Sequence, residues 1–76
     1  MITTVEQVQA WLEAGLDEAQ IQVSGDGRHF EAKIISAQFE GKNTLSRHRM
    51  VYAALGDKMD EAIHALSLVT LTPNES

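Results

Sequence analysis

Three histidines are the side chains of this 76-residue sequence best suited to bind a metal, because the chain has no cysteine. His64 begins the apolar segment His64–Thr72, where an exposed imidazole could offer one nitrogen to a metal ion. One histidine alone does not hold a metal tightly, so this hypothesis requires further ligands from elsewhere. The alternative is a structural histidine whose ring packs at the start of a strand and bonds a nearby backbone group.

Asp26 and His29 are a second set of candidate ligands, in and just after the glycine-rich turn Gly25-Asp26-Gly27. A loop and the strand that follows it can bring two ligands close together. The alternatives are that Asp26 only forms the turn, as aspartate often does by bonding the backbone, and that His29 is solvated on a polar strand face.

Basic residues gather at the expected start of a second helix: Lys42, Arg47, His48 and Arg49, with Arg28 as a further candidate. Cations in a first helical turn oppose the helix dipole. The cluster therefore favours an anionic partner, such as nucleic acid or an acidic protein surface. The alternative is an ordinary charged helix start, with His48 on a solvated face.

Composition excludes several classes of function. Six Lys and Arg against eleven Asp and Glu give a net charge of −5, which argues against a protein that coats nucleic acid. The lack of cysteine excludes disulfides and thiolate metal sites. No catalytic motif is present, and Gly25-Asp26-Gly27 lacks the lysine of a phosphate-binding loop. We expect one domain over residues 1–76, no membrane span, no secretory signal and a cytoplasmic location.

Two helices and three strands must position these candidates. We expect a helix over Met1–Gly15, capped by Thr3 with Glu6 in a capping box and closed by a left-handed Gly15. Its apolar stripe is Val5, Val8 and Leu12. Alternation predicts strands over Gln20–Ser24 and His29–Ser36, joined as a hairpin. The inward residues of the second strand are Phe30, Ala32 and Ile34, and Phe39 would anchor the following loop.

Thr44 or Ser46 is expected to cap the second helix, and Gly56 ends or kinks it, with further helical turns over Asp57–Ala62. Its predicted buried stripe is Leu45, Val51, Leu55, Met59 and Ile63. The third strand is His64–Thr72, followed by a frayed tail over Asn74–Ser76. This order predicts an α+β fold: an αββαβ sandwich in which two helices cover one face of a three-stranded mixed sheet and leave the other face largely wet.

Several blocks of the sequence, taken in order, resemble the BolA family. The turn block is most similar to IbaG-type (YrbA-type) bacterial members. The blocks are Val23-Ser24-Gly25-Asp26-Gly27-Arg28-His29-Phe30, Phe39-Glu40-Gly41-Lys42, Arg47-His48-Arg49-Met50-Val51-Tyr52, Ile63-His64-Ala65-Leu66 and Leu71-Thr72-Pro73. The resemblance implies a fold similar to class II KH domains, in agreement with the predicted element order.

The resemblance also implies a non-enzymatic partner of a monothiol glutaredoxin, without a small-molecule substrate. The pair shares a two-iron two-sulfur cluster with glutathione, and the isolated chain binds none tightly. The family's histidine ligand falls on His64, and its loop ligand falls on Asp26, with His29 three residues further on. The implied role is iron–sulfur cluster assembly, trafficking, or iron and stress sensing. The alternatives are a DNA-binding transcriptional regulator that uses the basic residues, and a plain interaction module with a structural His64.

Overall fold

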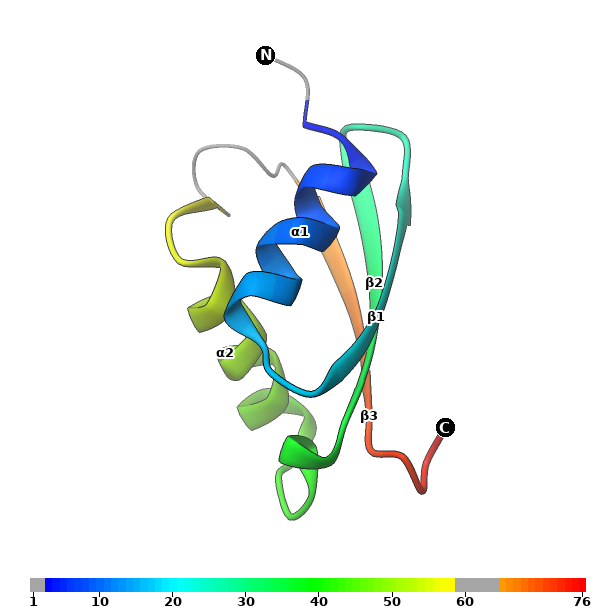
Figure 1. Ribbon diagram of the computed structural model, residues 1–76, viewed down its shortest axis with the longest axis vertical. Helices are drawn as coiled ribbons and strands as arrows, with labels where there is room; N and C mark the ends of the chain where they lie inside the picture. The colour runs from blue at the N-terminus through cyan, green and yellow to red at the C-terminus, as the bar shows by residue number, and fades with distance from the viewer. Residues whose placement is uncertain (1–2, 59–64) are drawn as a thin grey trace.

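The computed structural model describes residues 3–58 and 65–76 and confirms the predicted order of elements (Figure 1). The elements are α1 (Val5–Gly15), β1 (Ala19–Gly25), β2 (His29–Ser36), the short 3-10 helix η1 (Ala37–Phe39), α2 (Thr44–Leu55) and β3 (Ala65–Leu71). The predictions for Met59, Ile63 and His64, and for most of Asp57–Ala62, lie outside the described residues.

The three strands form the predicted mixed sheet, in the order β1-β2-β3. The hairpin pair β1 and β2 is antiparallel, with Ile21 opposite Ile34, whereas β2 and β3 are parallel, with Ala32 opposite Leu68. Both helices cover the same face of this sheet (Figure 1). A mixed sheet results because the tight turn reverses the chain, while α2 returns it to the end from which β2 starts.

The core lies between the helices and the inner face of the sheet. Period-two alternation on β2 buries Phe30, Ala32 and Ile34, and Phe39 is fully buried just beyond this strand, as predicted. The remaining buried apolar residues are Val8, Leu12, Leu16, Ile21, Val51 and Leu55. The outer face is mostly polar; its apolar residues include Ile35 and Leu71, which are half-buried, and Val69, which is 41% exposed. Within the described residues, no helix is long and apolar enough to cross a membrane.

The predicted caps of both helices are wrong by one or more positions. Thr4, not Thr3, caps α1: its side-chain oxygen accepts the Gln7 N–H at 3.1 Å, and the Gln7 side chain accepts the Thr4 N–H at 3.0 Å. This capping box uses glutamine where the prediction used Glu6. Asn43 caps α2 and accepts the Ser46 N–H at 2.9 Å, because asparagine is at least as good a cap as Thr44.

Gly15 has a different role from the predicted one. It does not adopt a left-handed conformation, and the chain leaves the helix through the extended residue Leu16. A β-carbon at Gly15 would lie 2.7 Å from both the Cβ and the carbonyl oxygen of Ala54. Glycine is therefore required for the close approach of α1 to α2. The left-handed conformation in this turn falls instead on Glu18, with φ of 53°.

The predicted stripe of α2 is correct at Val51 and Leu55 and wrong at Leu45, which is 59% exposed. Leu45 lies in the first turn, and its spacing of six residues from Val51 does not match the helical repeat. Gly56 ends α2, with φ of 60°, and its N–H donates to the Tyr52 carbonyl at 3.0 Å. Of the two predicted alternatives, Gly56 therefore ends the helix and does not kink it.

The frayed tail predicted over Asn74–Ser76 is also wrong. The N–H groups of Glu75 and Ser76 donate to the Thr72 carbonyl at 3.0 and 3.2 Å. The Ser76 hydroxyl donates to the Pro73 carbonyl at 2.9 Å. These bonds close a turn after β3, and a side-chain contact described below attaches the turn to the body of the protein.

Candidate functional site

The turn between β1 and β2 is organised by Asp26. Its Oδ1 accepts the backbone N–H groups of Arg28 and His29, both at 2.9 Å, and its own N–H donates to the His29 carbonyl at 3.2 Å. These two accepted bonds, first that of His29 and then that of Arg28, lower the pKa of the Asp26 carboxyl because they favour its charged form. Asp26 therefore forms the turn, as one of its alternatives predicted.

The side chains of Asp26 and His29 also lie near each other. Asp26 Oδ2 and His29 Nδ1 are 3.9 Å apart, and the two side chains are 71% and 78% exposed. This distance is too long for a hydrogen bond, so both atoms remain open to a ligand or a docked partner. Among the described residues, no group of three or more histidine, aspartate or glutamate side chains could hold a metal. The pair is at most a part of a metal site.

The strand register brings this turn to the start of β3. His29 pairs with Ala65, the first residue of β3, in the parallel ladder between β2 and β3. The hairpin turn and the start of β3 therefore lie at the same end of the sheet (Figure 1). His64 itself lies outside the described residues; it directly precedes Ala65 in the sequence.

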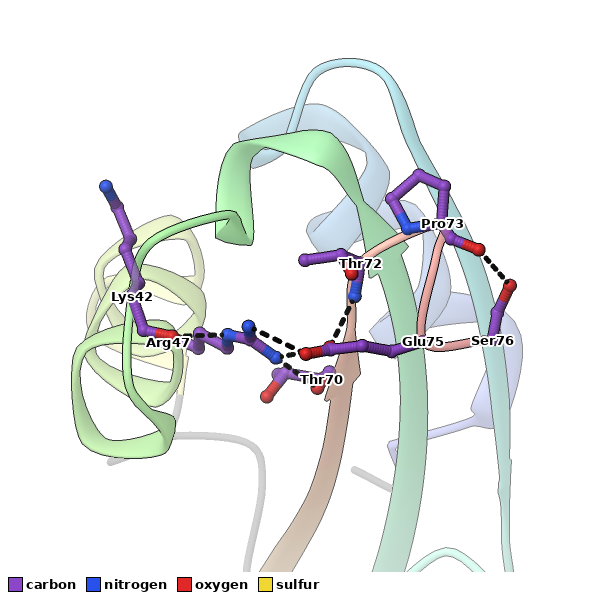
Figure 2. Close-up of polar contacts among 7 residues, drawn as sticks. All are labelled: Lys42, Arg47, Thr70, Thr72, Pro73, Glu75 and Ser76. Atoms are coloured by element: carbon purple, nitrogen blue, oxygen red, sulfur yellow. Dashed lines mark hydrogen bonds and ion pairs between the residues drawn. The ribbon is translucent and has the colours of Figure 1, made fainter.

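Arg47 holds together three parts of the chain at the other end of the sheet (Figure 2). Its Nε donates to the Lys42 carbonyl at 2.9 Å, and Nη1 donates to the Thr70 carbonyl at 3.1 Å. Nη1 and Nη2 also donate to the two carboxylate oxygens of Glu75, at 2.7 and 3.3 Å. The side chain is only 12% exposed, and its guanidinium lies 5.8 Å from the centre of the Phe39 ring.

The predicted basic residues do not form one continuous surface. Arg47 and Arg49 are two positions apart on α2, so their side chains project from different sides of the helix. The Lys42 ammonium points away from Arg47, which contacts only the Lys42 carbonyl (Figure 2). Lys42 and Arg49 are exposed and His48 is half-buried. Arg28 belongs to the hairpin turn, at the opposite end of the molecule from the start of α2 (Figure 1).

Sequence reasoning missed Glu75. Arg47 donates two hydrogen bonds to its carboxylate, and the Thr72 N–H donates a third at 2.9 Å; together these lower its pKa to about 2. The sequence signal is weak: Glu75 is the one acidic residue after Glu61, and it follows Pro73, which favours a turn. No local pattern pairs it with an arginine 28 residues earlier.

Residues 7–75 match the family model described as BolA-like protein. The chain is 51% identical over 51 residues to the chloroplastic protein BOLA1 of Arabidopsis thaliana, of which it spans 32%. It is 48% identical to BOLA2 of the same plant, covering 88% of this chain and 75% of that one. It is 38% identical to the DNA-binding transcriptional regulator BolA of Escherichia coli, covering 68% of this chain and 50% of that one.

A solved structure shows the same fold. A bolA protein homologue from Coxiella burnetii superposes with a TM-score of 0.91 at 48% identity, over 97% of this chain and 96% of the other. The family-model match over residues 7–75 includes both the hairpin turn and Glu75.

Proposed function

The chain belongs to the BolA-like protein family, and on that premise we propose that it is a non-enzymatic partner of a monothiol glutaredoxin in iron–sulfur cluster assembly, trafficking or sensing. The observation that carries the proposal is the pairing of His29 with Ala65. It sets the open Asp26–His29 pair beside the strand that follows His64. In the proposed complex, His64 supplies one ligand and Asp26 or His29 a second.

The donor set fits one half of a shared two-iron two-sulfur site. The sequence has no cysteine, so thiolates must come from the glutaredoxin and its glutathione. When bound, the cluster would accept or donate an electron. Histidine ligands give such a cluster a higher reduction potential than thiolate ligands do. Histidine side chains of this protein would hold one side of the cluster. Imidazole binds metal only in its neutral form, so this ligation is lost when the ring is protonated.

Reconstitution tests this proposal. The protein is mixed with a monothiol glutaredoxin, glutathione, iron and sulfide, and visible absorption and circular dichroism are compared with those of glutaredoxin alone. We expect a changed spectrum for the mixture. Comparing Asp26→Ala with His29→Ala then identifies the second ligand, and Glu31→Ala, on the same outer face of β2, is the matched control. Complex formation with an unchanged spectrum would instead support a plain interaction module.

A second candidate function is DNA-binding transcriptional regulation. Lys42 and Arg49 are exposed, α2 contains no acidic residue, and a relative from Escherichia coli is described as a DNA-binding transcriptional regulator. We expect any DNA binding to weaken steeply with salt. If Arg49 neutralises one phosphate, Arg49→Ala should make the logarithmic salt dependence of the affinity shallower by about one unit. If no DNA is retarded at low salt, this function is wrong.

We also propose that the chain is an IbaG-type member of the family, because of the sequence block from Val23 to Phe30. A cytoplasmic location and a role in the stress response are parts of the same proposal.

A further inference from the structure

Three hydrogen-bond donors converge on the carboxylate of Glu75 (Figure 2). Arg47 Nη1 and the Thr72 N–H reach Oε1 at 2.7 and 2.9 Å, and Arg47 Nη2 reaches Oε2 at 3.3 Å. A guanidinium that contacts both carboxylate oxygens, with a backbone N–H on one of them, is the geometry by which proteins recognise carboxylates.

These donors are held in place by groups other than Glu75. Arg47 also donates to the carbonyl oxygens of Lys42 and Thr70, at 2.9 and 3.1 Å. Its guanidinium lies near the buried ring of Phe39. Thr72 is only 5% exposed and directly follows β3. The donors are therefore preorganised, which lowers the entropic cost of binding an acceptor.

The Glu75 side chain, which accepts these hydrogen bonds, is less firmly held than the groups that donate them. Glu75 is 45% exposed and belongs to the short turn after β3. Besides the carboxylate contacts, the turn is closed by hydrogen bonds to the carbonyls of Thr72 and Pro73. The contacts of Arg47 with the Lys42 and Thr70 carbonyls do not involve this side chain.

We propose that the Arg47 guanidinium and the Thr72 N–H form a carboxylate-binding site that Glu75 fills from within the chain. When Glu75 is absent or displaced, the site accepts a free carboxylate or an acidic side chain of another polypeptide, and the tail acts as an intrachain competitor. The site lies at the end of β3, away from the hairpin turn (Figure 1). It is therefore independent of the proposed cluster ligands.

Chemical rescue tests the site in the full chain. Glu75→Ala removes a CH2–COO⁻ group, which is the size of acetate. We expect Glu75→Ala to melt at a lower temperature than the wild type, and sodium acetate to raise its Tm above the value in sodium chloride of equal ionic strength. Glu13→Ala, which removes an exposed acidic side chain on α1, is the matched control. It should respond equally to both salts, as should the double variant Arg47→Lys with Glu75→Ala.

A second readout applies if Glu75→Ala melts too low for a clear transition. Acetate should then shift the NMR signals of the Arg47 Nε–H and the Thr72 backbone N–H in this variant at low temperature, saturably and more than chloride does. Equal effects of acetate and chloride in both measurements, or equal rescue of Glu13→Ala, would overturn the proposal. The contact would then operate only as an internal ion pair. The same measurements with a peptide that contains one glutamate show whether the site binds an acidic side chain of a polypeptide as well as a free carboxylate.

Discussion

Arg47 and Glu75 stand 28 residues apart in the sequence and are joined by two hydrogen bonds of 2.7 and 3.3 Å. This pair connects the start of α2 to the turn after β3. It also explains why an arginine that the sequence assigns to an anion-binding surface has most of its side chain covered. The basic side chains that remain exposed in this region are Lys42, which precedes α2, and Arg49 within it.

Arg47→Ala should destabilise the fold by about 2 kcal/mol, because it leaves the Thr70 carbonyl without this partner and removes packing against Phe39. Arg49→Ala, which alters an exposed residue of the same helix, should change the free energy of unfolding by less than about 0.5 kcal/mol. Urea unfolding monitored by circular dichroism measures both. Equal losses in the two variants would contradict a structural role for Arg47.

The Arg47–Glu75 contact should make stability depend on pH in the acid range. The pKa of Glu75 falls from 4.5 to about 2 on folding, so its stabilising contribution is complete above the unfolded value. The contribution is then lost as pH falls from 4.5 through about 2. Wild type should therefore have a higher Tm than Glu75→Gln at pH 7, and the two should converge near the low folded-state pKa. A difference that does not change with pH would contradict the ion pair.

Gly15→Ala should destabilise the protein although alanine favours helices. The added Cβ would lie 2.7 Å from Ala54, and such overpacking costs about 1–3 kcal/mol, more than the gain of up to about 1 kcal/mol in helix propensity. Adding Ala54→Gly should recover part of the loss, because the two sites are in contact. Thermal unfolding of the two single variants and the double variant completes the cycle. Additive effects would argue against the contact.

Glu18→Gly should stabilise the protein by roughly 0.5–1 kcal/mol, because Glu18 has a φ of 53°, where side chains with a β-carbon are strained. Asp17→Gly is the control, since Asp17 has no positive φ and should gain nothing. Denaturant midpoints at constant slope provide the comparison. An equal change in both variants would show that the backbone at Glu18 is unstrained.

The sequence predicts the sheet better than the ends of the helices. Alternation fixes which residues of β2 face inward, because a shift of one residue would expose Phe30 and Ile34. The caps are misplaced because Thr3 and Thr4, and likewise Asn43 and Thr44, are both able to cap, and residue type alone does not decide between them. Glycine is favoured both where two helices approach closely and where the backbone is left-handed. The sequence therefore does not show which role Gly15 has unless the position of Ala54 is known.

The candidate site is predicted only in part. The hairpin turn and its two exposed side chains follow from local sequence, whereas the nearness of His29 to the start of β3 follows from the parallel register. The contact between Arg47 and Glu75 depends on how α2 packs against the end of β3, which no local pattern encodes. The role of His64 stays a prediction, because this residue lies outside the described part of the chain.

The most direct test of the central claim is the spectrum of the cluster reconstituted with glutaredoxin and either His64→Ala or the matched variant His48→Ala. We predict that His64→Ala largely removes the change in visible absorption and circular dichroism that the wild-type protein causes, while His48→Ala retains it. A wild-type spectrum from His64→Ala, with the complex still formed, would contradict the assignment of His64 as a ligand.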